Sequence, residues 1–119
     1  MQSFPGLKTL SATGIFIIVP DVKCAVFNLS LQLTATNTSG TLSYSVDKTC
    51  YPLERASFPD YNASESLLNS QAQWVSVESD IATSEFLNFA APLKGIRITM
   101  NTVGTGDSVA VAWIQQGII

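Results

Sequence analysis

A strict alternation of apolar and polar side chains between Phe27 and Thr36 constrains the fold more than any other feature of the sequence. Apolar residues occupy every second position from Phe27 to Ala35, and polar residues occupy the positions between them. This period of two is that of a β-strand with one face in a core and the other in water. A helix would spread the same apolar side chains around its whole circumference, so the pattern excludes a helix here.

The last quarter of the sequence predicts two more strands. From Ile96 to Asn101 the residues again alternate between apolar and polar. Between Val109 and Ile114, by contrast, both faces are apolar, which is typical of a strand that is central in its sheet or covered on both sides. Gly104 and Gly106 lie between the two segments, and glycines that accept positive φ predict that the segments form a hairpin.

Shorter runs predict the remaining strands, over residues 13–19, 42–46, 74–80 and 85–89. Turn-forming residues separate them, and Asn37 to Gly40 is expected to close a second hairpin. In the run 85–89 we expect Phe86 to face inward, and Leu87 and Phe89 are further candidates for the inner face. Seven or eight short strands without a substantial helix predict an all-β protein, an antiparallel, jelly-roll-like β-sandwich.

At 119 residues the chain is expected to be a single domain, 1–119. Residues 1–10 contain Pro5 and Gly6 and predict either an extended arm or an edge segment. Residues 48–73 are irregular, which indicates either a binding loop or a strand that the pattern does not reveal.

Charge and composition exclude several classes of function. The net charge is −3 and the few cations are scattered, so no basic surface for nucleic acid is expected. The chain has no histidine, the commonest general base and metal ligand. The apolar run 15–19 is too short for a signal peptide or a membrane span. We therefore expect a soluble, non-enzymatic protein without cofactor, metal, nucleic acid or membrane.

Only 13% of the residues are charged, and serine and threonine take their place. Two interpretations stay open. Such a surface suits a chain that packs against neighbours, and it also suits any β-rich chain, because threonine favours strands and serine favours turns.

Few residues remain as candidates for chemistry. Glu78, Asp80 and Glu85 could supply the carboxylate pair of a glycoside hydrolase, although a solvated strand edge is the preferred interpretation. Asp107 is interpreted as a turn former, because calcium requires several convergent carboxylates. Cys24 and Cys50 are expected to be two reduced thiols rather than one disulfide, since Cys24 falls in an apolar strand.

The aromatic residues suggest both core and contact roles. Trp74 and Trp113 lie in predicted strands and are interpreted as core residues. Tyr51, Phe58 and Tyr61 all fall in the irregular stretch 48–73. These three rings could stack on a sugar, insert into a partner surface or fold back to close one end of the sandwich.

The doubly apolar strand also predicts an interface. A sheet in a two-layer sandwich buries only one of its faces, so the second face of this strand must meet a partner, an arm or solvent. We expect that face, formed by Ala110, Ala112 and Ile114, to contact another subunit, with Gln115 and Gln116 as a polar rim. The segment 1–10 is expected to contribute to this contact.

Two stretches of the sequence resemble a known group of proteins. A proline precedes an apolar-Arg-apolar strand, a Gly-Thr-Gly turn and a valine-rich strand that ends in Gln-Gln-Gly, and a Gly-Thr strand ends in aspartate earlier in the chain. These residues are Pro92, Ile96-Arg97-Ile98, Gly104-Thr105-Gly106, Val109 to Gly117, and Gly40 to Asp47. The pattern, which extends over Ala25 to Gly117, resembles that of small β-sandwich structural proteins of tailed bacteriophages.

This resemblance implies a non-enzymatic homo-oligomer of the capsid cement or decoration type. Such a subunit would bind a major capsid protein on the capsid surface of the virion, after assembly in the host cytoplasm. Tail, head-fibre and adaptor proteins share the same pattern, and no functional residue carries over from the group. The alternative is a carbohydrate- or receptor-binding β-sandwich that uses Tyr51, Phe58 and Tyr61.

Overall fold

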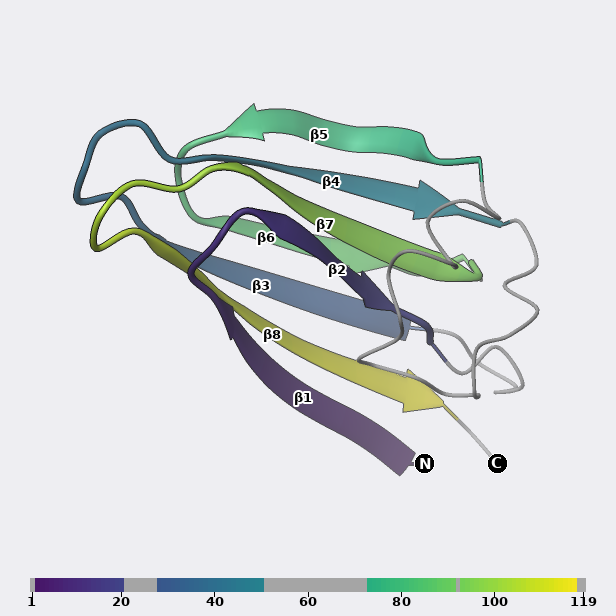
Figure 1. Ribbon diagram of the computed structural model, residues 1–119. Helices are drawn as coiled ribbons and strands as arrows, with labels where there is room; N and C mark the ends of the chain where they lie inside the picture. Colours follow the sequence, from purple (N-terminus) through teal and green to yellow (C-terminus); the bar gives the residue numbers. More distant parts are fainter. Residues whose placement is uncertain (1, 21–27, 51–72, 92, 118–119) are drawn as a thin grey trace.

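The computed structural model describes residues 2–20, 28–50, 73–91 and 93–117, which form two layers of β-sheet (Figure 1). These ranges contain no helix. The eight strands are β1 (Gln2–Leu10), β2 (Gly14–Ile18), β3 (Asn28–Thr36), β4 (Ser43–Thr49), β5 (Val75–Ile81), β6 (Glu85–Phe89), β7 (Gly95–Thr102) and β8 (Ser108–Gly117). The alternating segments of the sequence thus become strands, and the all-β prediction is confirmed.

The strand pairing follows a simple rule. β1 pairs with β8, β2 with β7, β3 with β6 and β4 with β5, all antiparallel. The pairs β3–β8 and β4–β7 then join these ribbons into the sheets β1-β8-β3-β6 and β2-β7-β4-β5. A long antiparallel ribbon that is rolled into two facing sheets in this way is a jelly roll.

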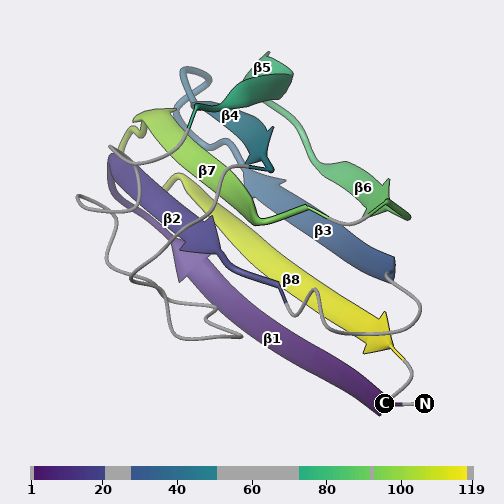
Figure 2. The ribbon, with the colours of Figure 1, turned by 90° about the vertical axis from the view of Figure 1, so that its right-hand side faces the viewer.

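Both predicted hairpins are wrong. β7 and β8 are consecutive but lie in different sheets, and so do β3 and β4. Their connections cross from one layer to the other, as Figure 2 shows. Gly40 and Gly106 do take positive φ, 80° and 83°, but a crossing between layers uses such turns as readily as a hairpin does. The apolar faces of β7 and β8 therefore oppose each other across the core instead of lying side by side.

The N-terminal segment is an edge strand. β1 pairs with β8 from Gln2 to Leu10, so this part of the chain is an edge segment of its own sheet rather than an arm. β8 lies between β1 and β3, which confirms that the doubly apolar strand is central. Residues 51–72 lie outside the described residues. The additional strand considered for this stretch therefore stays a prediction.

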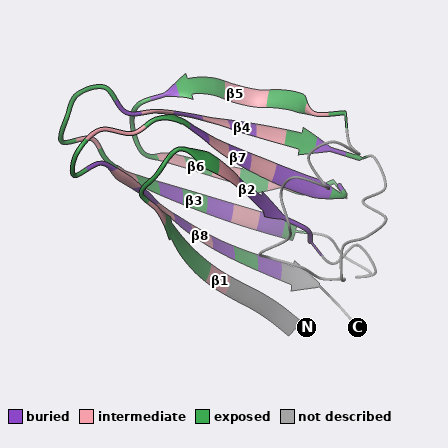
Figure 3. Cartoon of the chain, viewed as in Figure 1, coloured by how far each residue is buried: buried purple, intermediate pink, exposed green. Residues whose placement is uncertain are grey.

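The core lies between the inner faces of the two sheets (Figure 3). Leu29, Leu31 and Leu33 of β3 are fully buried, whereas Gln32 is exposed, as the alternation predicted. β7 contributes Ile96, Ile98 and Met100, and β8 contributes Val109, Val111 and Trp113. A single apolar cluster joins these strands, which agrees with one two-layer domain.

Gly6 of β1 leaves the space that the Trp113 indole occupies. The two residues are paired across β1 and β8, and a Cβ atom on Gly6 would lie 2.1 Å from two carbons of the indole. No side chain fits at that distance, so a glycine is required here. The indole also packs against Phe16 of the opposite sheet, with ring centroids 5.7 Å apart.

Asp107 ties two of the layer-crossing connections together. Its carboxylate accepts hydrogen bonds from the Ser39 amide at 2.9 Å, the Ser39 hydroxyl at 2.5 Å and the Gly104 amide at 2.8 Å. Gly104 must be small, since a Cβ atom there would lie 2.5 Å from the Ser39 side chain. The hydrogen bond from the Ser39 side chain contributes most to lowering the pKa of Asp107, and backbone amides add to it. Asp107 is therefore a structural residue that joins the 37–42 and 103–107 loops.

Replacing Asp107 with asparagine is expected to lower the melting temperature by several degrees at pH 7. The amide group can accept at only one of its two ends, so at least one donor loses its partner. Because the folded-state pKa is lowered, the ionised carboxylate stabilises the fold above its unfolded pKa, and this contribution disappears as the pH falls through the folded pKa. Thermal unfolding of both proteins between pH 7 and pH 2 checks this prediction. A gap in melting temperature that stays constant on acidification would contradict it.

Tyr44 closes one end of the core with its hydroxyl. The side chain is fully buried, and the hydroxyl donates to the carbonyl oxygen of Thr83 at 2.6 Å. Burial, with smaller contributions from the nearby Glu85 and Glu78 carboxylates, raises the pKa of Tyr44 to about 12. The phenol therefore stays neutral in the folded protein at pH values where a free tyrosine ionises.

Replacing Tyr44 with phenylalanine is expected to lower the free energy of unfolding at pH 9 by about 1 kcal/mol, the usual net value of one hydrogen bond. Because the folded pKa is raised, the stabilisation by this phenol is complete below its unfolded pKa and is lost as the pH rises through about 12. The stability difference between wild type and variant should therefore shrink in this alkaline range. Urea unfolding at pH 9, 10 and 11 measures it, and a widening gap would refute the prediction.

Candidate interaction surface

The outer face of the sheet β2-β7-β4-β5 is polar and paired within itself. Arg97 of β7 donates to one carboxylate oxygen of Asp47 from Nη2 at 2.7 Å and from Nε at 2.9 Å. The same guanidinium carbon lies 4.8 Å from the ring centre of Trp74, a cation–π geometry. Trp74 is thus half-buried on this outer face, and the prediction that it is a core residue is wrong.

The outer face of the other sheet, β1-β8-β3-β6, has no ionisable group among its described side chains. We call it the neutral face. Strand register and alternation assign to it Leu7, Thr9, Ser30, Gln32, Thr34, Phe86, Asn88, Ala110, Ala112 and Ile114. One row across the sheet runs Leu7, Ala112, Gln32, Phe86, and the next runs Ile114, Ser30, Asn88.

Exposed apolar side chains concentrate on the neutral face. Leu7 is 71% exposed, Phe86 64% and Ile114 39%. Among the described residues only one other large apolar side chain is exposed, Val75 of β5 in the opposite sheet. Single exposed apolar residues need no explanation, but three on one uncharged sheet face form a patch that is typical of a contact surface.

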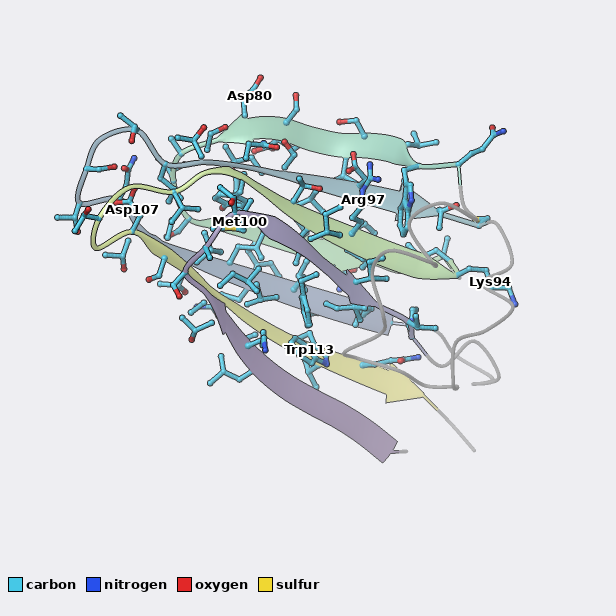
Figure 4. The ribbon with its side chains drawn as sticks, in the orientation of Figure 1. Asp80, Lys94, Arg97, Met100, Asp107 and Trp113 are labelled. Carbon is cyan, nitrogen blue, oxygen red and sulfur yellow. The ribbon has the colours of Figure 1, made fainter. Side chains whose placement is uncertain are left out.

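A shallow depression of about 270 Å³ lies in the neutral face. Its walls are the larger side chains Gln32, Phe86 and Ile114, and small residues form its floor: Gly6, Ser30 and Ala112. Trp113 also lines it, although its side chain points into the core (Figure 4). The depression is thus wide enough to receive a protruding apolar side chain.

The predicted interface residues are only partly on this face. Ala110 and Ala112 are half-buried on it and Ile114 is exposed, as expected. Gln115 is fully buried, so its assignment to a polar rim is wrong. Gln115 lies two residues after Trp113 in the same strand, so both side chains are on the core face. The side chain of Gln116 lies outside the described residues.

The sequence did not indicate that Gln32 and Leu7 belong to the neutral face, and it indicated the wrong face for Phe86. The polar side of β3, with Gln32, forms its uncharged part, and the alternation had indicated only a wet face. Leu7 lies in the segment 1–10, in which apolar and polar residues do not alternate regularly. Phe86 was expected to face inward, but it is exposed together with Asn88, whereas Leu87 and Phe89 pack against the core. β6 has only five residues, and apolar residues occur on both of its faces. The alternation alone therefore does not identify the buried face.

Of the three candidate acidic residues, the structure brings Glu78 and Glu85 into contact and leaves Asp80 apart. A hydrogen bond with the Glu85 carboxyl raises the pKa of Glu78, with burial as a second cause. Asp80 extends outward from β5 with a positive φ of 54° (Figure 4). Cavities of about 540, 270 and 220 Å³ are lined by described residues, and Glu78, Asp80 and Glu85 do not line these three.

The largest of these cavities lies at one end of the sandwich. Its apolar lining consists of Val75 of β5 and of Phe89, Ala90, Ala91 and Leu93, and Thr49 and Cys50 also line it. Cys50 is exposed and not in a disulfide, whereas Cys24 lies outside the described residues. Tyr51, Phe58 and Tyr61 also lie outside them, so their contact with a sugar or a partner stays a prediction.

The described part of the chain shows neither a metal-ligand cluster nor a membrane-spanning helix. No three or more acidic or cysteine side chains there are placed to hold a metal ion. No helix there is long and apolar enough to cross a membrane.

The described residues form a jelly-roll β-sandwich in which the outer face of one sheet has no ionisable side chain. Comparison with known proteins adds little: no family model matches the sequence, and no curated protein matches it. Among solved structures, the crystal structure of the Yersinia pseudotuberculosis-derived mitogen is similar to this chain with a TM-score of 0.41 and 11% sequence identity. That alignment covers 99% of this chain and 86% of the mitogen.

Proposed function

We propose that this chain is a non-enzymatic viral structural protein, a capsid cement or decoration subunit. It associates with further copies of itself and binds the major capsid lattice, and the neutral face is its contact surface. The class of virus protein rests on the resemblance of residues 25–117 to small β-sandwich proteins of tailed phages. The contact surface rests on the structure.

The observation that carries the proposal is the contrast between the two outer faces. The core of a protein–protein interface is depleted of charged residues and enriched in aromatic ones. The neutral face shares the depletion of charge, and Phe86 is its one aromatic side chain, exposed together with Leu7 and Ile114. The opposite face, by contrast, carries charged groups, among them the ion pair of Arg97 and Asp47.

The architecture suits binding to a large assembly. The neutral face is built on four hydrogen-bonded strands, so its side chains are held in place before binding and little conformational entropy is lost. A subunit that binds only the assembled lattice stabilises that lattice by mass action. Many copies act together on one particle, so a modest affinity per contact is enough.

Mass spectrometry of purified particles from the virus that encodes the chain tests the proposal. A decoration subunit is expected at a copy number of the same order as that of the major capsid protein. A copy number far below it would indicate a tail or adaptor component, and absence from the particles would refute a structural role. Binding of purified protein to immobilised glycans, with no particle association, would favour the carbohydrate-binding alternative.

Variants connect the proposal to the neutral face. Ile114→Asp is expected to reduce occupancy on particles, because binding would bury an unpaired charge. Val75→Asp is the matched control, since Val75 is also a large exposed apolar residue but lies in the other sheet. Equal occupancy of the two variants would show that the lattice is bound elsewhere.

A further inference from the structure

We propose that the neutral face binds the neutral face of a second copy, about a twofold axis that runs parallel to the strands between β8 and β3. This inference rests on the proposed function, because it names the first partner of the same surface. A face that is buried between two copies is not open to the lattice, so the dimer is the form of the free subunit and separates when the subunit binds the lattice. Charge, area and the placement of large and small side chains support it.

Charge favours a second copy as the partner. The chain carries a net charge of −3, so two copies repel each other at long range. The neutral face is the side on which this repulsion is weakest, because its described side chains include no ionisable group. A twofold contact places each residue near the same surface of the other copy, so a charged face would bring like charges together. An uncharged face avoids this cost.

The size of the face is sufficient for a stable dimer. Four strands about 4.8 Å apart and about eight residues long, at about 3.4 Å per residue, give a flat area of about 500 Å². The accessible surface of side chains exceeds this projection, so two such faces together bury more than about 1,000 Å². This reaches the range of specific protein–protein interfaces.

The rows across the neutral face are complementary under this symmetry. An axis parallel to the strands keeps each row at its own level and reverses its order in the second copy. Leu7 on β1 then opposes Phe86 of the other copy on β6, and the reciprocal contact is made at the other edge. In the next row Ile114 opposes Ser30, so a large side chain meets a small one.

The depression in the neutral face also favours the axis parallel to the strands. Ser30 is part of its floor, so this axis directs Ile114 of one copy into the depression of the other. A twofold axis perpendicular to the strands would instead place Phe86 opposite Phe86 and Ala112 opposite Ala112. That arrangement leaves a void at the centre, where interfaces are normally packed as densely as protein interiors. The side-chain sizes therefore select the parallel axis.

Light scattering coupled to size-exclusion chromatography measures the mass of the full chain in solution. Twice the chain mass of 12.8 kDa is expected. Leu7→Lys and Phe86→Glu are each expected to raise the dimer dissociation constant by about 30-fold or more, the effect of removing an interface hot spot. The double variant should recover most of this affinity, because the introduced lysine then opposes the introduced glutamate of the other copy. Within one chain the two positions lie at opposite edges of the sheet, so the recovery requires the proposed contact.

Val75→Asp is the control for a new charge on an exposed apolar site, and it should remain dimeric. Circular dichroism confirms that each variant is folded. A wild-type protein that is monomeric at all concentrations overturns the inference, and so does a double variant no better than the single ones. If a monomeric wild type still binds particles and Ile114→Asp does not, the proposed function stands and only the dimer is refuted.

Discussion

Replacing Trp113 with alanine is expected to lower the free energy of unfolding by about 3–5 kcal/mol, the range for truncating a large buried aromatic residue. The indole is almost completely buried, and it bridges the two layers through Phe16 of β2. The slot that Gly6 leaves open fits this ring, so its removal creates a cavity that β1 cannot easily close. Urea unfolding followed by circular dichroism gives the free energy.

Trp74→Ala is the matched control for this experiment. Trp74 is only half-buried and contacts Arg97 on the outside of the other sheet. A cation–π contact at a partly exposed site contributes about 0.5–1 kcal/mol, so the loss should be small. If the two tryptophan variants were equally destabilised, Trp113 would not have the bridging role described above.

Leu31→Ala is expected to cost about 2–5 kcal/mol, because it deletes a fully buried side chain and leaves a cavity. Leu31 is paired with Trp113 on one side and with Leu87 on the other, so it lies in the middle of its sheet. Denaturant unfolding of dilute protein measures the change. A loss below about 1 kcal/mol would mean that the neighbouring strands collapse into the space.

The adjacent position supplies the control. Gln32 is exposed on the neutral face, and its side-chain amide has a long contact of 3.4 Å to the Thr34 hydroxyl. Gln32→Ala should therefore change the stability of the isolated chain by less than about 0.5 kcal/mol. A larger loss that appears only at high protein concentration would show that a second copy covers this face. A large loss at every concentration would contradict the exposure of Gln32.

The sequence was most informative where apolar and polar residues alternate. In β3 it identified which side chains are buried, Leu31 among them, because the period of two follows from backbone geometry alone. In β8 it identified a central strand from its two apolar faces. It was least informative in β6, where the apolar residues do not alternate and Phe86 was assigned to the wrong face. The face of Gln115 could have been deduced from its parity with Trp113, but its polar side chain suggested an exposed rim.

Strand pairing could not be deduced from the sequence. The glycines at 40 and 106 indicated tight turns, but a turn does not specify whether the next strand continues in the same sheet or crosses to the other. Both crossings depend on contacts between residues far apart in the chain, such as the hydrogen bonds from Ser39 and Gly104 to Asp107. The same reason explains why the sequence left residues 1–10 open between an arm and an edge segment, because β8, their partner strand, lies at the other end of the chain.

By itself, the sequence determined that this chain forms a two-layer β-sandwich, since its alternating segments can each bury only one face. It also determined that one face of β8 would be left for other contacts. Only the tertiary structure decided that Leu7, Phe86 and Ile114 share a single uncharged surface, because they come from three strands that the chain order does not make neighbours. Long-range pairing, rather than local pattern, brings them together.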